Sequence, residues 1–296
     1  MAWFMGIDIG SLTTKGVITK DGKVQVSHII PSAGNYTTAA QDVRDALLAK
    51  AGLRSEDISC ISTTGHGADS VLFSNQAVAD IRCCARGINH LFPEVRTIID
   101  VQGQSSQVIR LNEKGQVINV VGSEKCASGS GRFIEIIARV LQMDLKDIGP
   151  LSLKSVTPVI FTTGCAVFGE SEVISRISEG VSKEDIVAGV HKSLADKLSA
   201  LLDRVGREER CAISGGGGLN IGLIQKLEQK LGVSLVVPPQ PQLTNALGAA
   251  VIGQEEWAKS PSDKPLPVLA QKQKWGPEDV EVEVDGKTYL EDDGLI

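Results

Sequence analysis

The chain repeats one pattern of residues, and this internal duplication constrains its fold more than any other feature of the sequence. Residues 7–18 align with residues 99–110, so that Asp8 falls on Asp100 and the hydroxyl residues that follow each Asp coincide. Each copy continues into a second apolar run, a turn that contains glycine, and a third apolar run. This succession is typical of three strands joined by tight turns. The sequence therefore predicts a duplicated α/β fold with two lobes.

Helical and strand patterns follow each copy of the repeat. The first copy is followed by a helical pattern that starts at Thr37 or Thr38 and by a strand at 58–62. After the second copy we predict helices near 131–143, 166–179, 182–205 and 219–231, strands at 211–213 and 235–237, and a last helix from Thr244. Beyond Lys259 the composition shifts to prolines and then to a run of alternating Val and Glu, which predicts a linker and a small hairpin or appended strand.

These patterns divide the chain into three parts. We predict an N-terminal lobe at 1–95, closed by the helix at 244–257, a C-terminal lobe at 96–243, and a linker with a short C-terminal extension at 258–296.

Composition and charge exclude several classes of protein. Hydrophobic residues make up 42% of the chain and charged residues 22%, which is close to the average of soluble globular proteins. The net charge of -6 would repel a polyphosphate backbone, so we expect no nucleic-acid partner. The longest uncharged apolar stretch, 243–253, is too short to cross a bilayer, and the N-terminal run lacks the basic start of a secretory leader. We therefore expect a cytoplasmic protein with no membrane partner.

The turn after the first repeated Asp has the chemistry of a phosphate site. Backbone amides, hydroxyls and one cation can all face phosphate oxygens, while Asp8 can hold a hydrated Mg²⁺ between itself and the phosphates. The candidate phosphate ligands are Gly10, Ser11, Thr13, Thr14 and Lys15. One such turn alone could equally be an ordinary hairpin, but two matching turns favour a nucleotide site.

The second turn mirrors the first. Asp100 would approach the same Mg²⁺ from the opposite lobe, with Gly103, Gln104 and Ser105 facing the terminal phosphate and Gln104 able to orient the attacking water. We therefore predict Asp8, Asp100 and Gln104 as catalytic residues. A later run of four glycines enters a helix, where backbone amides can approach a ribose or adenine closely. The predicted contacts there are Gly215, Gly216, Gly217, Gly218 and Asn220.

These motifs resemble a known superfamily. The two Asp turns, the late glycine cluster and the segment 243–250 are similar to the phosphate, adenosine and connecting motifs of the actin, Hsp70 and sugar kinase superfamily. The resemblance extends from residue 5 to about residue 257. It implies two ribonuclease H-like lobes that close on Mg-ATP or Mg-ADP.

Two of the six cysteines stand at or just before a predicted helix start. The partial positive charge of a helix N-terminus would stabilise a thiolate at Cys126 or Cys165 and the negative charge of an iron–sulfur cluster. Two thiolates provide half of the four ligands of a [4Fe-4S] cluster, so the other pair must come from a second subunit. The alternative is that both are ordinary buried thiols, as we expect for Cys60, Cys83, Cys84 and Cys211.

The segments around these two cysteines carry a more specific resemblance. Residues 125–133 and 165–173 are similar to the cluster-ligand segments of the BadF/BadG/BcrA/BcrD ATPase family, which includes activators of 2-hydroxyacyl-CoA dehydratases and ATPase subunits of class I benzoyl-CoA reductases. The resemblance implies a cluster shared with an identical or paralogous ATPase subunit. It also implies ATP-driven transfer of a low-potential electron to catalytic iron–sulfur reductase or dehydratase subunits, and a ferredoxin-type donor.

The second turn departs from the family pattern. The family usually has Asp-Ile-Gly-Gly-Gln-Asp-x-Lys, whereas Gln102, Ser105 and Gln107 replace the first Gly, the second Asp and the Lys here. Such a chain would bind ATP but hydrolyse it slowly, or leave hydrolysis to a paralogous subunit. With the C-terminal extension, this favours a benzoyl-CoA reductase subunit over a homodimeric dehydratase activator. A small-molecule kinase and a nucleotide-gated binding module are the further alternatives.

Overall fold

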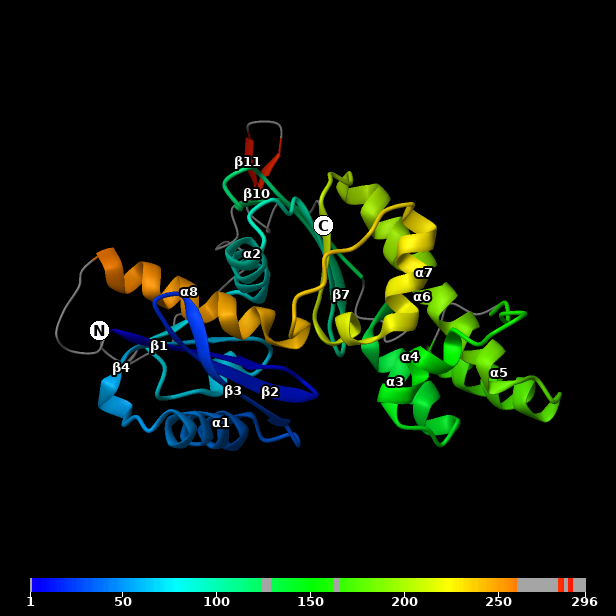
Figure 1. Cartoon of the computed structure of the whole chain (residues 1–296), viewed down its shortest axis with the longest axis horizontal. Coiled ribbons are helices and arrows are strands. Elements are labelled where there is room, and N and C mark those ends of the chain that lie inside the picture. Colours follow the sequence, from blue (N-terminus) through cyan, green and yellow to red (C-terminus); the bar gives the residue numbers. More distant parts are fainter. Residues whose placement is uncertain (1, 124–128, 162–165, 260–281, 285–286, 290–296) are drawn as a thin grey trace. The chain divides into compact units, whose positions relative to one another are not determined.

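The computed structural model describes residues 2–123, 129–161, 166–259, 282–284 and 287–289. The chain divides into two compact units (Figure 1). The first unit comprises Met1–Glu94, Leu111–Asn119 and Leu243–Ile296, and the second comprises Val95–Arg110 and Val120–Gln242.

The first unit is built on a five-stranded sheet with the order β3-β2-β1-β4-β5. Strand β1 pairs antiparallel with β2 and parallel with β4, so it lies at the centre of the sheet. The strands are β1 (Trp3–Ile9), β2 (Thr13–Lys20), β3 (Lys23–Pro31), β4 (Ile58–Thr64) and β5 (Gln76–Ala77). Helices α1 (Tyr36–Ala51) and α8 (Thr244–Lys259) cover its faces, and α2 (Asp80–Leu91) packs on α8.

Alternation along β1 directs its side chains to two different helices. Met5, Ile7 and Ile9 join a buried cluster that includes Val43 of α1. Phe4 points the other way, into a cluster that includes Ala246 of α8. The period of two that a strand imposes on its side chains therefore places one apolar layer on each face of the sheet.

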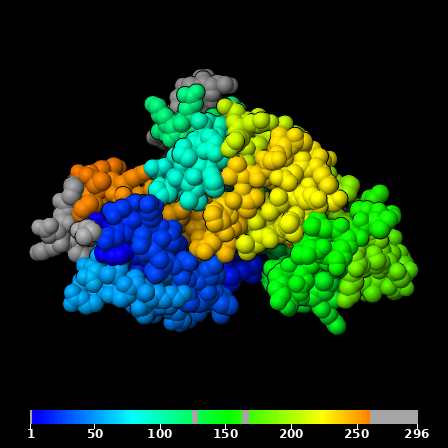
Figure 2. Space-filling model, viewed as in Figure 1, coloured from blue at the N-terminus to red at the C-terminus, as the bar shows by residue number. Residues whose placement is uncertain are grey.

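Helix α8 is buried on all sides along residues 244–253 because it lies between the sheet and α2. In the space-filling view its orange surface lies between the blue N-terminal strands and the cyan surface of α2 (Figure 2). Two glycines allow this close approach. A Cβ at Gly6 of β1 would overlap the carbonyl oxygen of Ala246, and one at Gly248 would overlap the carbonyl oxygen of Cys83 in α2.

The second unit repeats the topology of the first. Its four-stranded sheet has the order β8-β7-β6-β9, in which β6 pairs antiparallel with β7 and parallel with β9. The strands are β6 (Thr97–Val101), β7 (Ser106–Leu111), β8 (Val117–Gly122) and β9 (Cys211–Ser214). The order is that of β3-β2-β1-β4, so the predicted duplicated α/β fold is confirmed.

Helices of the second unit follow the predicted patterns closely, except that the helix at Leu145–Ser152 was not predicted and two other elements depart from their predictions for local reasons. They are α3 (Gly131–Val140), α4 (Leu145–Ser152), α5 (Ala166–Ser178), α6 (Lys183–Val205) and α7 (Ile221–Leu231). The helix predicted from 219 begins only after Asn220, whose side chain caps α7 by accepting from the Leu223 amide, and a 3₁₀ turn, η4 (Gly216–Leu219), precedes it. The strand predicted at 235–237 is wrong, since only Val236 pairs, with Ala212. The two prolines that follow have no amide to continue such a ladder.

Smaller elements complete the described chain. The 3₁₀ turns η1 (Ser55–Asp57), η2 (Ala68–Ser70) and η5 (Pro241–Leu243) lie in connections. The predicted C-terminal hairpin is confirmed as β10 (Val282–Val284) paired antiparallel with β11 (Lys287–Tyr289). Helix α1 starts after the N-cap Asn35, earlier than predicted, because the Asn35 side chain accepts from the Thr38 amide.

The expectation of buried thiols is confirmed at four cysteines. Cys60, Cys83, Cys84 and Cys211 are buried free thiols, and burial raises the pKa of the Cys60 thiol to about 11. Within the described residues, every helix is too short or too polar to cross a bilayer.

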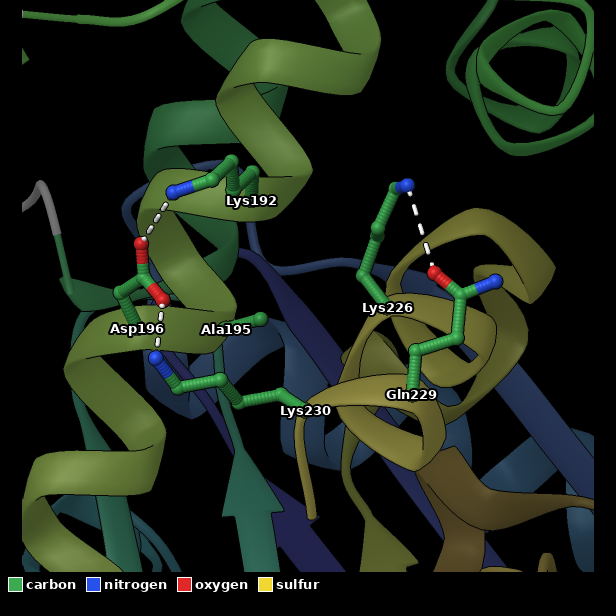
Figure 3. A pocket seen from close by; sticks show the side chains of 6 residues that line it. All are labelled: Lys192, Ala195, Asp196, Lys226, Gln229 and Lys230. Carbon is green, nitrogen blue, oxygen red and sulfur yellow. Dashed lines mark hydrogen bonds and ion pairs between the residues drawn. The ribbon is translucent and has the colours of Figure 1, made fainter. Parts of the chain in front are cut away.

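Helices α6 and α7 are joined by an ion pair on their outer side and by a buried histidine beneath. Asp196 of α6 pairs with Lys192 at 2.9 Å and with Lys230 of α7 at 2.8 Å, at the edge of a pocket of about 280 Å³ (Figure 3). His191 is fully buried, with its Nε2 2.9 Å from Asn220 Nδ2. Because the Asn220 Oδ1 accepts from the Leu223 amide, its Nδ2 donates to an unprotonated Nε2. Burial, assisted by the charge of Lys226, lowers the pKa of His191 to about 4.

The close packing of α8 predicts that Gly248→Ala destabilises the first unit. The added methyl would meet the backbone of α2, which cannot move as a side chain can, so we expect a loss of about 1–3 kcal/mol of unfolding free energy or more. Urea unfolding measures the loss. Gly122→Ala is the matched control, because a Cβ at Gly122 meets no atom within 4 Å. Equal stability of the two variants would contradict this account of α8.

His191 predicts an acid-sensitive second unit. The unfolded chain binds a proton near pH 6.5 and the folded chain only near pH 4, so stability falls as the pH drops through this window. From pH 7.5 to 5 the loss attributable to His191 is about 2 kcal/mol. Unfolding free energies of wild type and His191→Gln at both pH values isolate this contribution, since all other titrating groups are common to both proteins. The same pH slope in both would show that His191 does not carry it.

Candidate functional site

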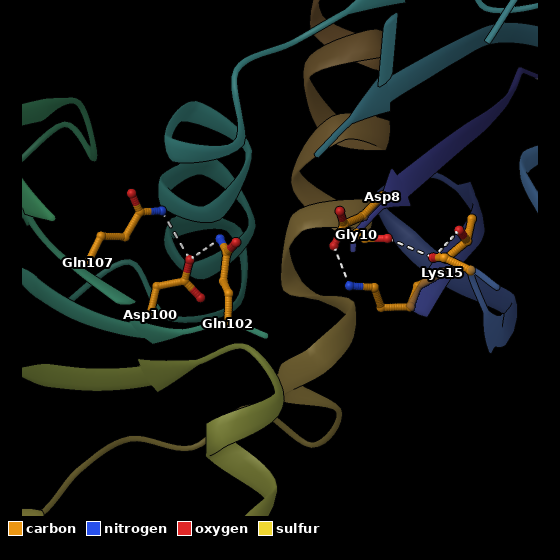
Figure 4. Close-up of polar contacts among 8 residues, drawn as sticks. Asp8, Gly10, Lys15, Asp100, Gln102 and Gln107 are labelled. Atoms are coloured by element: carbon orange, nitrogen blue, oxygen red, sulfur yellow. Dashed lines mark hydrogen bonds and ion pairs between the residues drawn. The ribbon is translucent and has the colours of Figure 1, made fainter. Parts of the chain in front are cut away.

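The first repeated Asp is held by a lysine on the neighbouring strand. Asp8 lies at the end of β1, is 5% exposed, and faces Lys15 of β2 in the antiparallel register. Lys15 Nζ is 2.7 Å from Asp8 Oδ2 (Figure 4). The Gly10 amide donates to the Thr13 carbonyl at 3.1 Å and closes the turn between the strands. A buried carboxylate and a cation therefore stand together at the mouth of a tight turn.

The second repeated Asp occupies the same place in its own sheet and is held by two amides. Asp100 is fully buried at the end of β6 and faces Gln107 of β7 in the register. Its Oδ2 accepts from Gln102 Nε2 at 2.6 Å and from Gln107 Nε2 at 3.1 Å (Figure 4). The backbone amide of Gln102 donates to the Ser105 carbonyl at 3.0 Å, just as the backbone amide of Gly10 donates to the Thr13 carbonyl. The two turns thus share one backbone geometry.

A glycine loop passes against each carboxylate. In the parallel register Thr64 of β4 stands beside Asp8, and Ser214 of β9 stands beside Asp100. The next residue in each case is a glycine with positive φ, 86° at Gly65 and 75° at Gly215. A Cβ at Gly65 would overlap Asp8 Oδ1, and one at Gly215 would lie 2.9 Å from Asp100 Oδ1. Only glycine allows the backbone to pass here.

The loop at Gly65 is a further element beside the first carboxylate, and Gly65 was not among the ligands that we predicted from the sequence. Thr64-Gly65-His66-Gly67 and Ser214-Gly215-Gly216-Gly217 follow equivalent strands, and both lead into a 3₁₀ turn. The detectable signal is a hydroxyl residue, a glycine, any residue and a second glycine directly after a strand. It occurs once in each half of the chain.

The predicted ligands are divided between the two units. Asp8, Gly10, Ser11, Thr13, Thr14 and Lys15 belong to the first unit, and Asp100, Gly103, Gln104, Ser105, Gly215, Gly216, Gly217, Gly218 and Asn220 to the second. Gln104 is exposed at the tip of its turn, which suits a residue that contacts a ligand. The Thr14 hydroxyl is buried 2.9 Å from that of Ser32, and both ends of the Asn220 side chain are bonded within the unit. These two side chains therefore have hydrogen-bond partners within their own units.

Cys126 and Cys165 lie outside the described residues. The structure does describe the helices that follow them: α5 begins at Ala166, directly after Cys165, and α3 begins at Gly131. The two helices pack together, and Gly169 of α5 lies so close to the Phe133 ring of α3 that a Cβ there would be 2.8 Å from it. Among the residues that the structure describes, no cluster of three or more His, Cys, Asp or Glu could hold a metal ion.

Comparison with known proteins identifies the family to which this chain belongs. Residues 5–253 match the BadF/BadG/BcrA/BcrD ATPase family. The chain belongs to this family. The C-terminal extension predicted at 258–296 lies beyond the matched residues.

Members of the family with assigned roles differ in their similarity to this chain. The 2-hydroxyisocaproyl-CoA dehydratase activator of Clostridioides difficile is 39% identical over 256 residues, which cover 86% of this chain and 96% of the activator. One of the subunits of the benzoyl-CoA reductase of Thauera aromatica is 36% identical over 220 residues, which cover 72% of this chain and 78% of that relative.

Solved structures confirm the predicted fold class. The activator of the 2-hydroxyisocaproyl-CoA dehydratase from Clostridium difficile, solved with bound ADPNP, superposes with a TM-score of 0.84 and 39% identity over 87% of this chain and 96% of the activator. A ROK family glucokinase from Streptomyces griseus, 13% identical, superposes with a TM-score of 0.53 over 86% of this chain and 100% of the kinase, and shares the fold alone. The ATPase family member thus has the duplicated, ribonuclease H-like fold of the sugar kinases.

Proposed function

We propose that this chain is the ATP-hydrolysing activator of a 2-hydroxyacyl-CoA dehydratase. The observation that carries the proposal is its similarity to a dehydratase activator along almost the whole of that relative, at 39% identity and 96% coverage. Our sequence analysis favoured a benzoyl-CoA reductase subunit because of the altered second turn and the C-terminal extension. The match to the reductase subunit covers 78% of that relative, so the comparisons support the activator better.

In this proposal the turn after Asp8 and the turn after Asp100 both bind phosphates of Mg-ATP. The first turn belongs to the first unit and the second turn to the second unit. Lys15 and the turn amides after Asp8 face phosphate oxygens, and Gln104 of the second turn orients the attacking water. Carboxylate oxygens are the ligands that Mg²⁺ prefers, so Asp8 and Asp100 fit the ion by their chemistry. The ADPNP bound to the solved activator supports nucleotide binding by this chain.

In the proposed site, the glycine loop at 215–218 gives the nucleotide access to the backbone. At Gly216 a Cβ would meet no atom within 4 Å, so this position is open on its outer side, while Gly217 packs on Val101. The loop therefore has one face fixed to the strand and one face free for a ligand. We assign the open face to the ribose or adenine.

The electron-transfer part of the proposal rests on Cys126 and Cys165. Cys126 precedes α3 in the sequence and Cys165 precedes α5, and because these two helices pack together, the two thiolates are candidate ligands of one group. Two thiolates are half of the donor set of a [4Fe-4S] cluster, so a second copy of this chain would supply the rest. Such a cluster, when bound, passes single electrons of low potential. A ferredoxin-type protein would reduce it, and the catalytic dehydratase subunits would accept the electron.

The glycine loop against Asp8 predicts a large effect on nucleotide binding. Gly65→Ala would push a methyl into the Asp8 carboxylate, and we expect ADP to bind at least about tenfold more weakly in the presence of Mg²⁺, about 1.4 kcal/mol. Gly34→Ala is the matched control, because Gly34 also has positive φ, 77°, but has no atom within 4 Å of its Cβ position. Calorimetry compares the two variants. Equal ADP affinity would contradict the assignment of this loop to the site.

The cluster assignment predicts about four irons for each pair of subunits after purification without oxygen. Cys126→Ala and Cys165→Ala should each lose the iron and the EPR signal of the reduced protein. Cys60→Ala is the control, because Cys60 is a buried thiol of the first unit. Iron retained in both cysteine variants would contradict the assignment.

A separate assay with the native partner proteins distinguishes a dehydratase activator from a benzoyl-CoA reductase subunit. With dithionite and ATP, we expect the protein to activate dehydration of a 2-hydroxyacyl-CoA and not reduction of benzoyl-CoA. Stimulation of benzoyl-CoA reduction alone would overturn the proposal in favour of the reductase subunit. ATP turnover stimulated by a sugar in an iron-free protein would indicate a kinase.

A further inference from the structure

A buried histidine reaches the residue that ends the second glycine loop. His191 of α6 is fully buried, and its Nε2 accepts from Asn220 Nδ2 at 2.9 Å. The backbone amide of Asn220 donates to the Gly217 carbonyl at 3.1 Å and closes η4. The Asn220 side chain accepts from the Leu223 amide at 3.0 Å and caps α7. Asn220 therefore joins the glycine loop at 215–218 to α7, and His191 holds Asn220.

Helix α4 packs closely against this pair of side chains. A Cβ at Gly149 of α4 would lie 2.8 Å from Asn220 Oδ1. A Cβ at Gly222 of α7 would overlap Ser152 Oγ of α4 and would lie 2.7 Å from His191 Nδ1. Three helices thus meet at the imidazole, so closely that a side chain at either glycine would displace its neighbours.

Packing alone does not account for a histidine at this position. The ring is neutral at pH 7, because burial lowers the pKa of His191 to about 4. Since Nε2 accepts from Asn220, the proton of the neutral ring is on Nδ1. Nδ1 is buried and has no hydrogen-bond partner among the residues that the structure describes. An unpaired buried donor costs free energy that an apolar side chain of similar size, such as leucine, would avoid. The acceptor at Nε2 is therefore what a histidine provides here and a leucine would not.

The loop that Asn220 ends is fixed to the strand on one side. A Cβ at Gly217 would overlap the side chain of Val101 in β6, whereas one at Gly216 would meet no atom within 4 Å. The outer side of the loop therefore has no packing of its own at Gly216. Its position depends on the strand beneath it and on the two ends of the loop, of which Asn220 is one.

We propose that His191 is a positioning residue for the nucleoside part of the bound nucleotide. Its Nε2 holds Asn220, and Asn220 sets the path of the glycine loop whose open face we assigned to the ribose or adenine. Because the imidazole is fully buried, it acts through Asn220 and not by contact with the ligand. This inference rests on the proposed function, because it assumes that the glycine loop contacts the nucleotide.

The test separates the acceptor at Nε2 from the volume of the side chain. The amide oxygen of a glutamine can take the place of Nε2 and accept from Asn220, whereas leucine fills a similar volume with no acceptor. We expect His191→Gln to bind ADP in excess Mg²⁺ as wild type does, and His191→Leu to bind it about tenfold more weakly. Pyrophosphate, which lacks the ribose and the adenine, should bind to wild type and to both variants with equal affinity. Calorimetry measures both ligands.

A third variant and a stability measurement keep the inference falsifiable if His191→Leu is poorly folded. His191→Asn carries the same amide group one bond nearer to the backbone, so it should fail to reach Asn220 and should lose ADP affinity as His191→Leu does. Urea unfolding establishes which variants are folded. An equal loss of affinity for ADP and for pyrophosphate would show a purely structural role and overturn the inference. Unchanged ADP affinity in the folded Leu and Asn variants would also overturn it and would leave the proposed function intact. A wild-type protein that binds no ADP overturns both.

Discussion

A buried carboxylate at the end of a central strand is the constraint on which each unit depends. Asp8 and Asp100 lie near the ends of strands that are paired on both sides, and the described side-chain partners of both carboxylates come from the neighbouring antiparallel strand and the turn that joins it. Burial of an unpaired charge is costly, which fixes the register of β1 with β2 and of β6 with β7. The glycine loop after the parallel strand then encloses the carboxylate from the other side. This arrangement positions the turn residues that we predicted as phosphate ligands, because each turn directly follows a strand that carries a buried Asp near its end.

The duplication was predictable from the sequence because its signals are local. An Asp, a tight turn and hydroxyl residues lie within a dozen residues in each copy, and the apolar period of two marks the strands around them. Helix α2 was not predicted from the sequence; it packs on another helix, α8, which lies far away in the sequence. Gly65 was missed for a related reason. Its requirement for glycine comes from Asp8, more than fifty residues earlier, and two glycines around a histidine are common in ordinary loops.

Neighbouring residues also override a local pattern. The run before Pro238 has the composition of a strand, but only Val236 finds a partner, beside Cys211 and Ile213 of β9. Asn220 follows a glycine run, which led to the prediction of a nucleotide contact, and its side chain caps α7 and bonds to His191. That histidine is 29 residues away in the chain, so its pairing with Asn220 could not be read from either segment. The role of a polar side chain beside a glycine turn is decided by the helix that follows it.

Duplication followed by divergence at the turns gives the two buried Asp residues different partners. Both halves keep the strand order, the buried Asp and the glycine loop. The partner of the Asp is under a weaker constraint, since a lysine donates to Asp8 whereas two glutamine side chains donate to Asp100. The fold therefore agrees between the halves where the backbone requires it, and it differs where either kind of side chain can donate to the carboxylate.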